Sequence, residues 1–411
     1  MSRSQERAAG PAGCAPEGDL LSAAHPREAE DRFLLATYAK FPFAIVRGEG
    51  NYVFDENGKR YLDLYGGHAV SCLGHSHPRW VEAMRRQLET MDFYSNVCYL
   101  PLRAEAAERV LRKSYPSMAG AYFANSGAEA NETALKMARK LTGRPLAIAL
   151  NGGFHGRTIG ALSVTGVPKM RDAFPENLAD RTRFVDLGDA EAVESVPPGE
   201  TAAIILEPVQ SLAGVRVAPA AYYRFLREHA DRHGIVLIFD EVQTGSGRTG
   251  EWFAGHHWGV EPDIATTAKA VGGGFPVGMV LANARVAASV KSGDQGTTFG
   301  GGPLAARAVA TTYRILEEEG LVDRVARASA EVVGRLRDME RRGRIREVRG
   351  LGYLLGVECR TAAKEVQRRL LEAGILVGTS YQENTIRLLP PYTVGETEWE
   401  LFFEAFEKIC G

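Results

Sequence analysis

Cysteine is scarce in this chain and shows no paired arrangement. The five cysteines are scattered along the sequence, are odd in number and include no Cys-x-x-Cys pair. This pattern argues against a disulfide framework and against a zinc knuckle, and it is typical of reduced thiols in the cytoplasm. We therefore expect a cytoplasmic protein.

An excess of one charge and long apolar runs are also lacking. Lysine and arginine total 49 against 51 for aspartate and glutamate, so nothing indicates a nucleic-acid partner or an anionic membrane. The longest strand-like apolar run, residues 235–239, is far shorter than the roughly 20 residues that cross a bilayer. The first 30 residues lack the apolar core of a signal peptide. We expect neither nucleic-acid binding nor membrane insertion.

What the chain does contain is typical of a soluble globular protein. Its 411 residues are 45% hydrophobic and 24% charged, and at roughly 150 residues per domain this length predicts two or three domains. Residues 1–30 are expected to form a flexible tail, and residues 31–38 have helical character. Residues 45–53 and 58–64 alternate like two strands around a turn.

The middle of the chain alternates strand-like and helical stretches. Strands are expected at 120–124, 146–150, 202–207, 235–240, 264–268 and 277–281. Helices are expected at 78–90, 128–141 and 220–233. This alternation predicts an α/β fold with a mainly parallel sheet covered on both faces. A smaller α+β domain is expected from about residue 320, with helices at 321–342, 364–373 and from 396, and strands at 353–359 and 386–389.

Charged residues follow three of the expected strands. Glu207, the pair Asp240-Glu241 and Lys269 stand at carboxyl ends of strands, the edge at which parallel sheets bind ligands. A solvated charge that caps a strand would explain any one of them. Three together, with the glycines at 272–274 after Lys269, favour a binding site.

A fourth loop, Asn125-Ser126-Gly127-Ala128, follows a strand and opens a helix. Its N–H groups would form a phosphate cradle, although Ser126 would also serve as an ordinary N-cap. Pyridoxal phosphate uses a phosphate cradle, an acid and a lysine together. Of the lysines, only Lys269 ends a buried-looking strand.

These residues belong to a longer series of motifs. The series reads RGEG (47–50), GHSHP (74–78), NSGAEA (125–130), FHGRT (154–158), EPVQ (207–210), DEVQTG (240–245), Lys269 and GTTFGG (296–301). From Tyr38 to its C-terminus the chain resembles the class III aminotransferases, particularly the acetylornithine and ornithine group. Any one motif is weak evidence, but their common order and spacing make the resemblance highly specific.

The resemblance implies a fold-type I pyridoxal-phosphate-dependent transferase. Its large domain would span residues 76–310 around a mainly parallel seven-stranded sheet. A smaller α+β domain would span 311–411, and residues 31–75 would pack with it.

The resemblance also implies which residues would bind the cofactor ring. Lys269 would carry the aldimine and shuttle the proton, and Asp240 would pair with the pyridine nitrogen. Phe154 would stack on the ring, and Gln243 would contact its hydroxyl group.

The phosphate of the cofactor would be held by Ser126, Gly127 and Ala128. Thr298 would reach the phosphate of the neighbouring subunit, so the resemblance implies a homodimer as the active unit.

The substrate residues that the resemblance implies are Tyr38, His68, Arg157, Glu207 and Arg387. Tyr38, Arg157 and Arg387 match positions that bind carboxylates, for which the forked donors of arginine suit a bidentate contact. Arg387 stands in an otherwise apolar stretch, which argues against a surface role.

Residues 245–250 spell G-x-G-x-x-G and offer a distant alternative, an NAD-dependent dehydrogenase. No amphipathic helix follows, and no acidic residue ends a strand about 20 positions later. His75 with His77, and His229 with His233, lack further ligands at metal-binding spacing. We expect no metal site.

A nearer alternative is an aminomutase or decarboxylase that uses the same cofactor. The same residues serve each reaction, and the orientation of the substrate selects the bond that breaks. Only a transaminase needs a keto acid to turn over.

Three positions depart from the family pattern. Leu212 stands where relatives that use glutamate often carry a second glutamate, His68 replaces Ile or Tyr, and Gly302 replaces Asn. We expect an aminotransferase that moves an amino group from an ω-amino acid or acylated diamino acid to a 2-oxo acid such as 2-oxoglutarate. These departures leave the particular donor, the particular acceptor and the pathway open.

Overall fold

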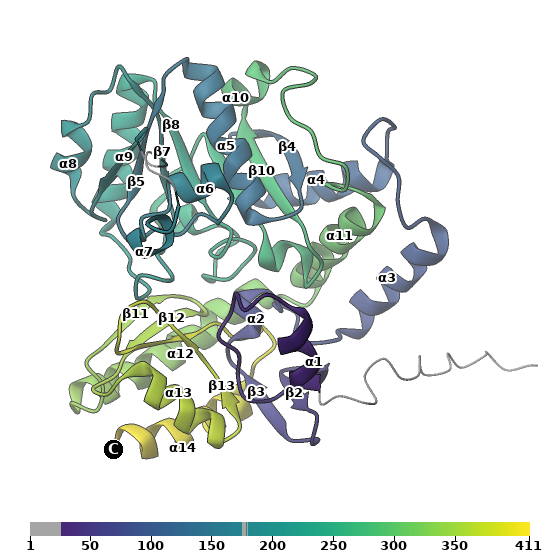
Figure 1. Ribbon diagram of the computed structural model, residues 1–411, viewed down its shortest axis with the longest axis vertical. Helices are drawn as coiled ribbons and strands as arrows, with labels where there is room; N and C mark the ends of the chain where they lie inside the picture. Colours follow the sequence, from purple (N-terminus) through teal and green to yellow (C-terminus); the bar gives the residue numbers. More distant parts are fainter. Residues whose placement is uncertain (1–25, 175–177, 179) are drawn as a thin grey trace, which may run out of the picture.

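The computed structural model describes residues 26–174, 178 and 180–411, so most of the tail expected at 1–30 lies outside the described residues. Figure 1 shows a large domain built around a twisted sheet, and a small domain that holds both the N-terminal strands and the C-terminal helices. In the described part of the chain, no helix is long and apolar enough to span a bilayer.

The first helix, α1, spans Pro26–Phe33 and not the predicted residues 31–38. Proline at its first position, Glu28 in the first turn and Arg32 in the last turn all favour a helix here. The predicted range overlaps the helix at residues 31–33 alone, and Leu34 and Leu35, which follow the helix, are exposed.

The large domain is built on the seven-stranded sheet that the resemblance implies. Its strand order is β4-β10-β9-β8-β7-β5-β6, and only β10 runs antiparallel to its neighbours. The strands are β4 Met118–Ala124, β5 Leu146–Leu150, β6 Thr182–Val185, β7 Thr201–Leu206, β8 Val236–Asp240, β9 Ile264–Thr267 and β10 Gly278–Asn283. The sequence patterns missed β6, a short edge strand with two polar residues.

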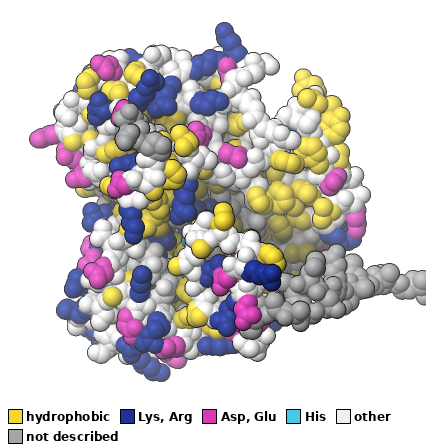
Figure 2. Space-filling view, viewed as in Figure 1, with side chains coloured by type: hydrophobic (Ala, Val, Ile, Leu, Met, Phe, Trp, Pro, Cys, Tyr) yellow, Lys and Arg dark blue, Asp and Glu magenta, His cyan; other side chains and the backbone are white. Residues whose placement is uncertain are grey.

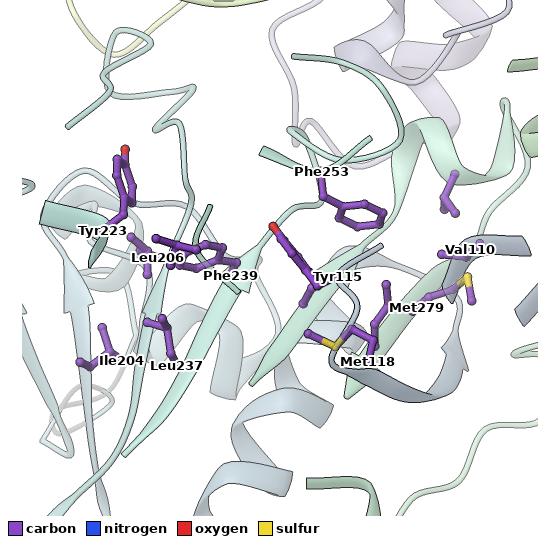
Figure 3. Close-up of a cluster of buried hydrophobic side chains, with 14 of the residues drawn as sticks. Val110, Tyr115, Met118, Ile204, Leu206, Tyr223, Leu237, Phe239, Phe253 and Met279 are labelled. Atoms are coloured by element: carbon purple, nitrogen blue, oxygen red, sulfur yellow. The ribbon is translucent and has the colours of Figure 1, made fainter. Parts of the chain in front are cut away.

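Side chains of the central strands alternate between the two faces of the sheet. Leu237 and Phe239 point into the larger hydrophobic core, together with Tyr115, Ile204 and Met279. Figure 3 shows part of this core. Because all five side chains are almost fully buried, the strand ends that carry charged residues are held on a rigid scaffold.

The other face of the sheet packs against α5 (Gly127–Thr142). Ala130, Ala134 and Ala138 lie at helical spacing and share a buried cluster with Ile238 of the sheet. Their small side chains let the helix approach the strands closely. The beginning of α5 therefore lies beside the carboxyl ends of the strands.

Further helices surround the sheet. They are α3 Pro78–Thr90, α4 Pro101–Lys113, α6 Ile159–Ser163, α7 Pro168–Arg171, α8 Ala190–Ser195, α9 Ala220–His233, α10 Ala284–Ser289 and α11 Pro303–Glu318, with 3₁₀ turns at Ala254–Trp258 and Lys269–Gly272. The sequence patterns missed α11, which is buried along most of its length and has only a narrow charged face, with Arg307 and Arg314 two turns apart.

The small domain contains two four-stranded sheets, β1-β2-β3-β13 and β11-β12-β15-β14. Its elements are β1 Ile45–Glu49, β2 Tyr52–Asp55, β3 Arg60–Asp63, α2 Gly66–Ala69, α12 Leu321–Arg341, β11 Glu347–Leu351, β12 Leu354–Glu358, α13 Ala363–Glu372, β13 Ile375–Leu376, β14 Gly378–Thr379, β15 Thr385–Leu388 and α14 Glu396–Cys410. The strand predicted at 45–53 is two strands, because the chain turns at Gly50 with φ +57°. Parallel pairing of β13 with β3 ties the N-terminal strands to the C-terminal part of the chain.

Candidate active site

A cavity of about 570 Å³ lies at the carboxyl ends of the large-domain strands. Figure 2 shows the furrow between the two domains. The cavity is lined by Tyr38, His68, Ser126, Gly127, Ala128, Phe154, Arg157, Glu207, Asp240, Gln243, Lys269 and Arg387. These are all the residues that the sequence predicted for the site except Thr298, which is exposed on the loop before α11.

Asp240, the last residue of β8, is held by three hydrogen bonds. Its Oδ2 accepts from Asn131 Nδ2 at 2.7 Å and from His155 Nδ1 at 2.8 Å, and its Oδ1 accepts from the N–H of Val242 at 3.0 Å. Only 3% of the residue is exposed. This arrangement fixes a carboxylate in a low-dielectric setting, ready to stabilise a positive charge in the cavity.

Asn131 and His155 were not singled out from the sequence. Asn131 lies on the buried face of α5, where it accepts from Thr266 Oγ1 at 2.7 Å and donates to the carbonyl oxygen of His155 at 2.8 Å. The available signal was a polar residue among the buried alanines of α5. His155 itself stands inside the FHGRT motif, beside Phe154.

Lys269 lies two residues after the end of β9, at the start of a 3₁₀ turn, and its backbone has φ +49°, a conformation that L-residues seldom adopt. Burial lowers the pKa of its amine, while the carboxylates of Asp240 and Glu207 act in the opposite direction. The guanidinium groups of Arg387 and Arg248 lower this pKa further. A buried lysine with a lowered pKa has more of the neutral, nucleophilic amine at neutral pH.

The beginning of α5 fits a phosphate group. Ser126 caps the helix through Oγ, which accepts from the N–H of Glu129 at 3.2 Å, while the N–H groups of Gly127 and Ala128 have no acceptor within the helix. A Cβ added to Gly127 would lie 2.8 Å from the side chain of Val242. The first turn thus presents free donors and a positive dipole end to the cavity.

Phe154 is hydrogen-bonded to Glu207, the residue that follows β7. Its backbone N–H donates to Glu207 Oε1 at 2.8 Å, and Glu207 is 7% exposed. Burial raises the pKa of the Glu207 carboxyl, and the nearby charge of Asp240 raises it further. In the structure, Glu207 therefore holds the loop that carries Phe154.

Arg387, in β15, enters the cavity from the small domain. Its Nε donates to the carbonyl oxygen of Thr379 at 2.8 Å, and its Nη1 donates to Ser211 Oγ at 2.9 Å. The guanidinium also lies 6.0 Å from the centre of the Tyr65 ring. Within the described residues no carboxylate forms an ion pair with it, although the residue is only 3% exposed.

His68 reaches the cavity from a left-handed turn. Gly66, Gly67, His68 and Ala69 all have φ between +55° and +67°, a conformation that costs non-glycine residues roughly 1–2 kcal/mol each. Tyr65 Oη and His68 Nδ1 lie 2.5 Å apart. Such strain at a cavity is typical of functional positions.

The rim of the cavity combines cationic and aromatic groups. The guanidinium of Arg157 lies 5.6 Å from the centre of the Tyr38 ring. Tyr381, which the sequence did not indicate, lines the same cavity, and its N–H donates to the carbonyl oxygen of Leu212 at 2.8 Å. Leu212 also lines the cavity, so its substitution for glutamate bears on the substrate end of the site.

The family described as Aminotransferase class-III matches residues 35–410 of the chain. The chain is a class III aminotransferase. It is 43% identical to the acetylornithine aminotransferase of Archaeoglobus fulgidus over 90% of this chain and 96% of that protein. It is 44% identical to the enzyme of the same name from Methanopyrus kandleri, over 91% and 96% of the two chains.

Solved structures of other aminotransferases share this fold. The ornithine aminotransferase of Toxoplasma gondii superposes with a TM-score of 0.86 at 30% identity, over 93% of each chain. An omega transaminase from Pseudomonas jessenii in complex with PMP has a TM-score of 0.87 at 25% identity, over 93% of this chain and 97% of that one. The predicted fold class and enzyme class are confirmed.

Proposed function

We propose that this aminotransferase uses pyridoxal 5′-phosphate to move an amino group from an ω-amino acid or acylated diamino acid, similar to acetylornithine, to a 2-oxo acid such as 2-oxoglutarate. The observation that carries the proposal is the meeting of Lys269, the buried Asp240 and the free N–H groups of α5 in one cavity. These three features supply an amine, an acid and an anion site for one cofactor.

The residues present fit this cofactor. Ser126, Gly127 and Ala128 would hold its phosphate, and Asp240 would hold a proton on its pyridine nitrogen. When bound, pyridoxal phosphate acts as an electron sink for the carbon that bears the amino group. Phe154 would cover one face of the ring.

The chain's own groups then account for the movement of protons. The lowered pKa of Lys269 favours a neutral Nζ, which would accept a proton from the substrate and return it at another carbon. Asn131 and His155 hold the Asp240 carboxylate in one orientation, so that it needs no rearrangement as charge develops.

The substrate end of the site favours carboxylates. Among the described residues Arg387 forms no ion pair and donates to neutral oxygens, and Arg157 and Tyr38 lie at the rim. In relatives that carry glutamate at the position of Leu212, this glutamate pairs with the arginine that matches Arg387. Leucine cannot form this ion pair. Arg387 is therefore free to bind a carboxylate or an acyl oxygen of the amino donor, and His68 would add a hydrogen bond.

A homodimer would complete the site. Thr298 lies exposed outside the cavity of its own subunit, as expected of a residue that reaches the phosphate site of a partner. Val97 and Tyr99, between α3 and α4, are 84% and 105% exposed, and apolar side chains gather on this side of the molecule in Figure 2. Such a patch is typical of a subunit interface.

A screen of amino donors against 2-oxoglutarate and pyruvate tests the proposal. We expect acidic or acylated amines to be better donors than ornithine, with the keto acid required for turnover. Turnover of an amine without a keto acid would contradict transamination. Preference for free ornithine would contradict the proposed substrate class.

A further inference from the structure

The G-x-G-x-x-G segment at residues 245–250 is a close-packed junction between the domains. Gly247 has φ +95°, and a Cβ added there would lie 2.7 Å from the side chain of Val322 in α12. Gly250 has φ +85°, and its added Cβ would lie 3.0 Å from Cα of Ala326. The glycines therefore allow this loop, which follows β8, to touch the small domain.

Arg248 lies fully buried at the centre of this junction. Its guanidinium donates to the carbonyl oxygens of Ala69 at 3.4 Å, Tyr353 at 3.3 Å and Pro390, and it lies 4.6 Å from the centre of the Tyr392 ring. None of these partners is a carboxylate. A buried cation with neutral partners carries a desolvation cost that an apolar side chain would avoid.

Two of the three carbonyl acceptors of Arg248, those of Ala69 and Pro390, belong to segments that carry substrate-end residues of the cavity. Ala69 directly follows His68 in the left-handed turn, and Pro390 lies three positions beyond Arg387. Both His68 and Arg387 line the cavity. The two segments also touch directly, because the N–H of Leu389 donates to the carbonyl oxygen of Leu64 at 2.8 Å.

We infer that Arg248 is a positioning residue that sets the spacing between His68 and Arg387 at the substrate end of the cavity. This inference rests on the proposed function. A lysine ammonium lacks the planar fork that reaches several carbonyls at once. Because the displaced groups would contact the substrate in the ground state and the transition state alike, their loss weakens binding more than it slows the chemical step.

The test compares Arg248→Lys and Arg248→Met with the wild type in two assays. The first is equilibrium binding of glutarate, a dicarboxylate without an amino group, and the second is the KM and kcat for 2-oxoglutarate. We expect the Kd for glutarate and the KM to rise about tenfold in both variants, while kcat falls less than about threefold.

Arg144→Lys is the matched control. Arg144 Nη1 also donates to three carbonyl oxygens, those of Pro198, Thr201 and His233, at 3.1, 3.2 and 2.9 Å. It follows the C-terminal end of α5, at the opposite edge of the sheet from Asp240. We expect this variant to lose thermal stability but to keep the wild-type KM and the wild-type Kd for glutarate.

The outcomes distinguish failure of the proposed function from failure of the inference about Arg248. If the wild type neither binds glutarate nor transaminates, the proposed function is wrong. If the wild type does both, and the Arg248 variants keep its KM and Kd while losing stability, Arg248 is only structural and the inference is wrong. Should neither Arg248 variant fold, Tyr392→Leu, which removes the ring beside the guanidinium, is judged by the same two assays.

Discussion

Asp240 and His155 form a hydrogen-bonded pair at the wall of the cavity, with Oδ2 and Nδ1 2.8 Å apart and side chains that are 3% and 0% exposed. Asn131 donates to the same carboxylate oxygen. Both donors bind the same oxygen of the Asp240 carboxylate, and exclusion of water strengthens the interaction of this carboxylate with a cation in the cavity.

Asp240→Asn should therefore lower kcat by about 10³-fold, because a neutral amide cannot stabilise the positive charge of a protonated ring nitrogen. Steady-state kinetics with saturating cofactor would measure the loss. Asp263→Asn is the control, since Asp263 is also a buried carboxylate but bonds Arg227 and Arg285 away from the cavity. Near-normal kcat in Asp240→Asn would show that another acidic residue stabilises the protonated pyridine nitrogen.

Lys269→Ala should abolish turnover and leave the fold intact, because the cavity would lose its reactive amine. The purified wild type should be yellow, and borohydride reduction followed by peptide mapping should find the pyridoxyl group on Lys269. Circular dichroism and thermal melting of the variant check the fold. A pyridoxyl group on any other lysine would refute the assignment.

Leu212→Glu should change the order of preference among substrates. The new carboxylate would pair with Arg387, whose acceptors among the described residues are Ser211 Oγ and the carbonyl oxygen of Thr379, and would compete with acidic or acylated donors. Stopped-flow half-reactions with each donor and keto acid measure the ranking. Leu212→Gln has nearly the same shape without the charge and serves as the control. An unchanged ranking would show that the residue at position 212 does not determine which substrates Arg387 binds.

A mixture of Lys269→Ala and Thr298→Ala subunits should regain activity after joint refolding. If Thr298 serves the partner's site, each mixed dimer has one site with both lesions and one with neither. Random mixing then restores roughly a quarter of the wild-type activity. Activity no higher than that of the parents, or a fully active monomer in size-exclusion chromatography, would argue against a shared site.

The strands that end at the candidate site residues were predictable because each is a short apolar stretch of sequence. Residues 146–150 and 236–239 are short apolar runs, and each is fully buried in the central sheet. Elements without such a local pattern were missed or misplaced. Helix α11 is buried along most of its length and carries few charged residues to mark its period, and the start of α1 depends on capping and charge at its ends.

The sequence by itself determined which candidate residues stand at the strand ends and the side of the sheet at which they meet. Parallel strands end at one side of a sheet, so a lysine and an acid at two strand ends are brought together whatever the loops do. Only the tertiary structure decided which groups hold them. His155 beneath Asp240, Ser211 beside Arg387, and Arg248 against Ala69 and Pro390 join residues far apart in the chain. The contacts of Ser211 and Arg248 depend on how the two domains pack, and the contact of His155 depends on packing within the large domain. No local pattern of residues encodes either packing.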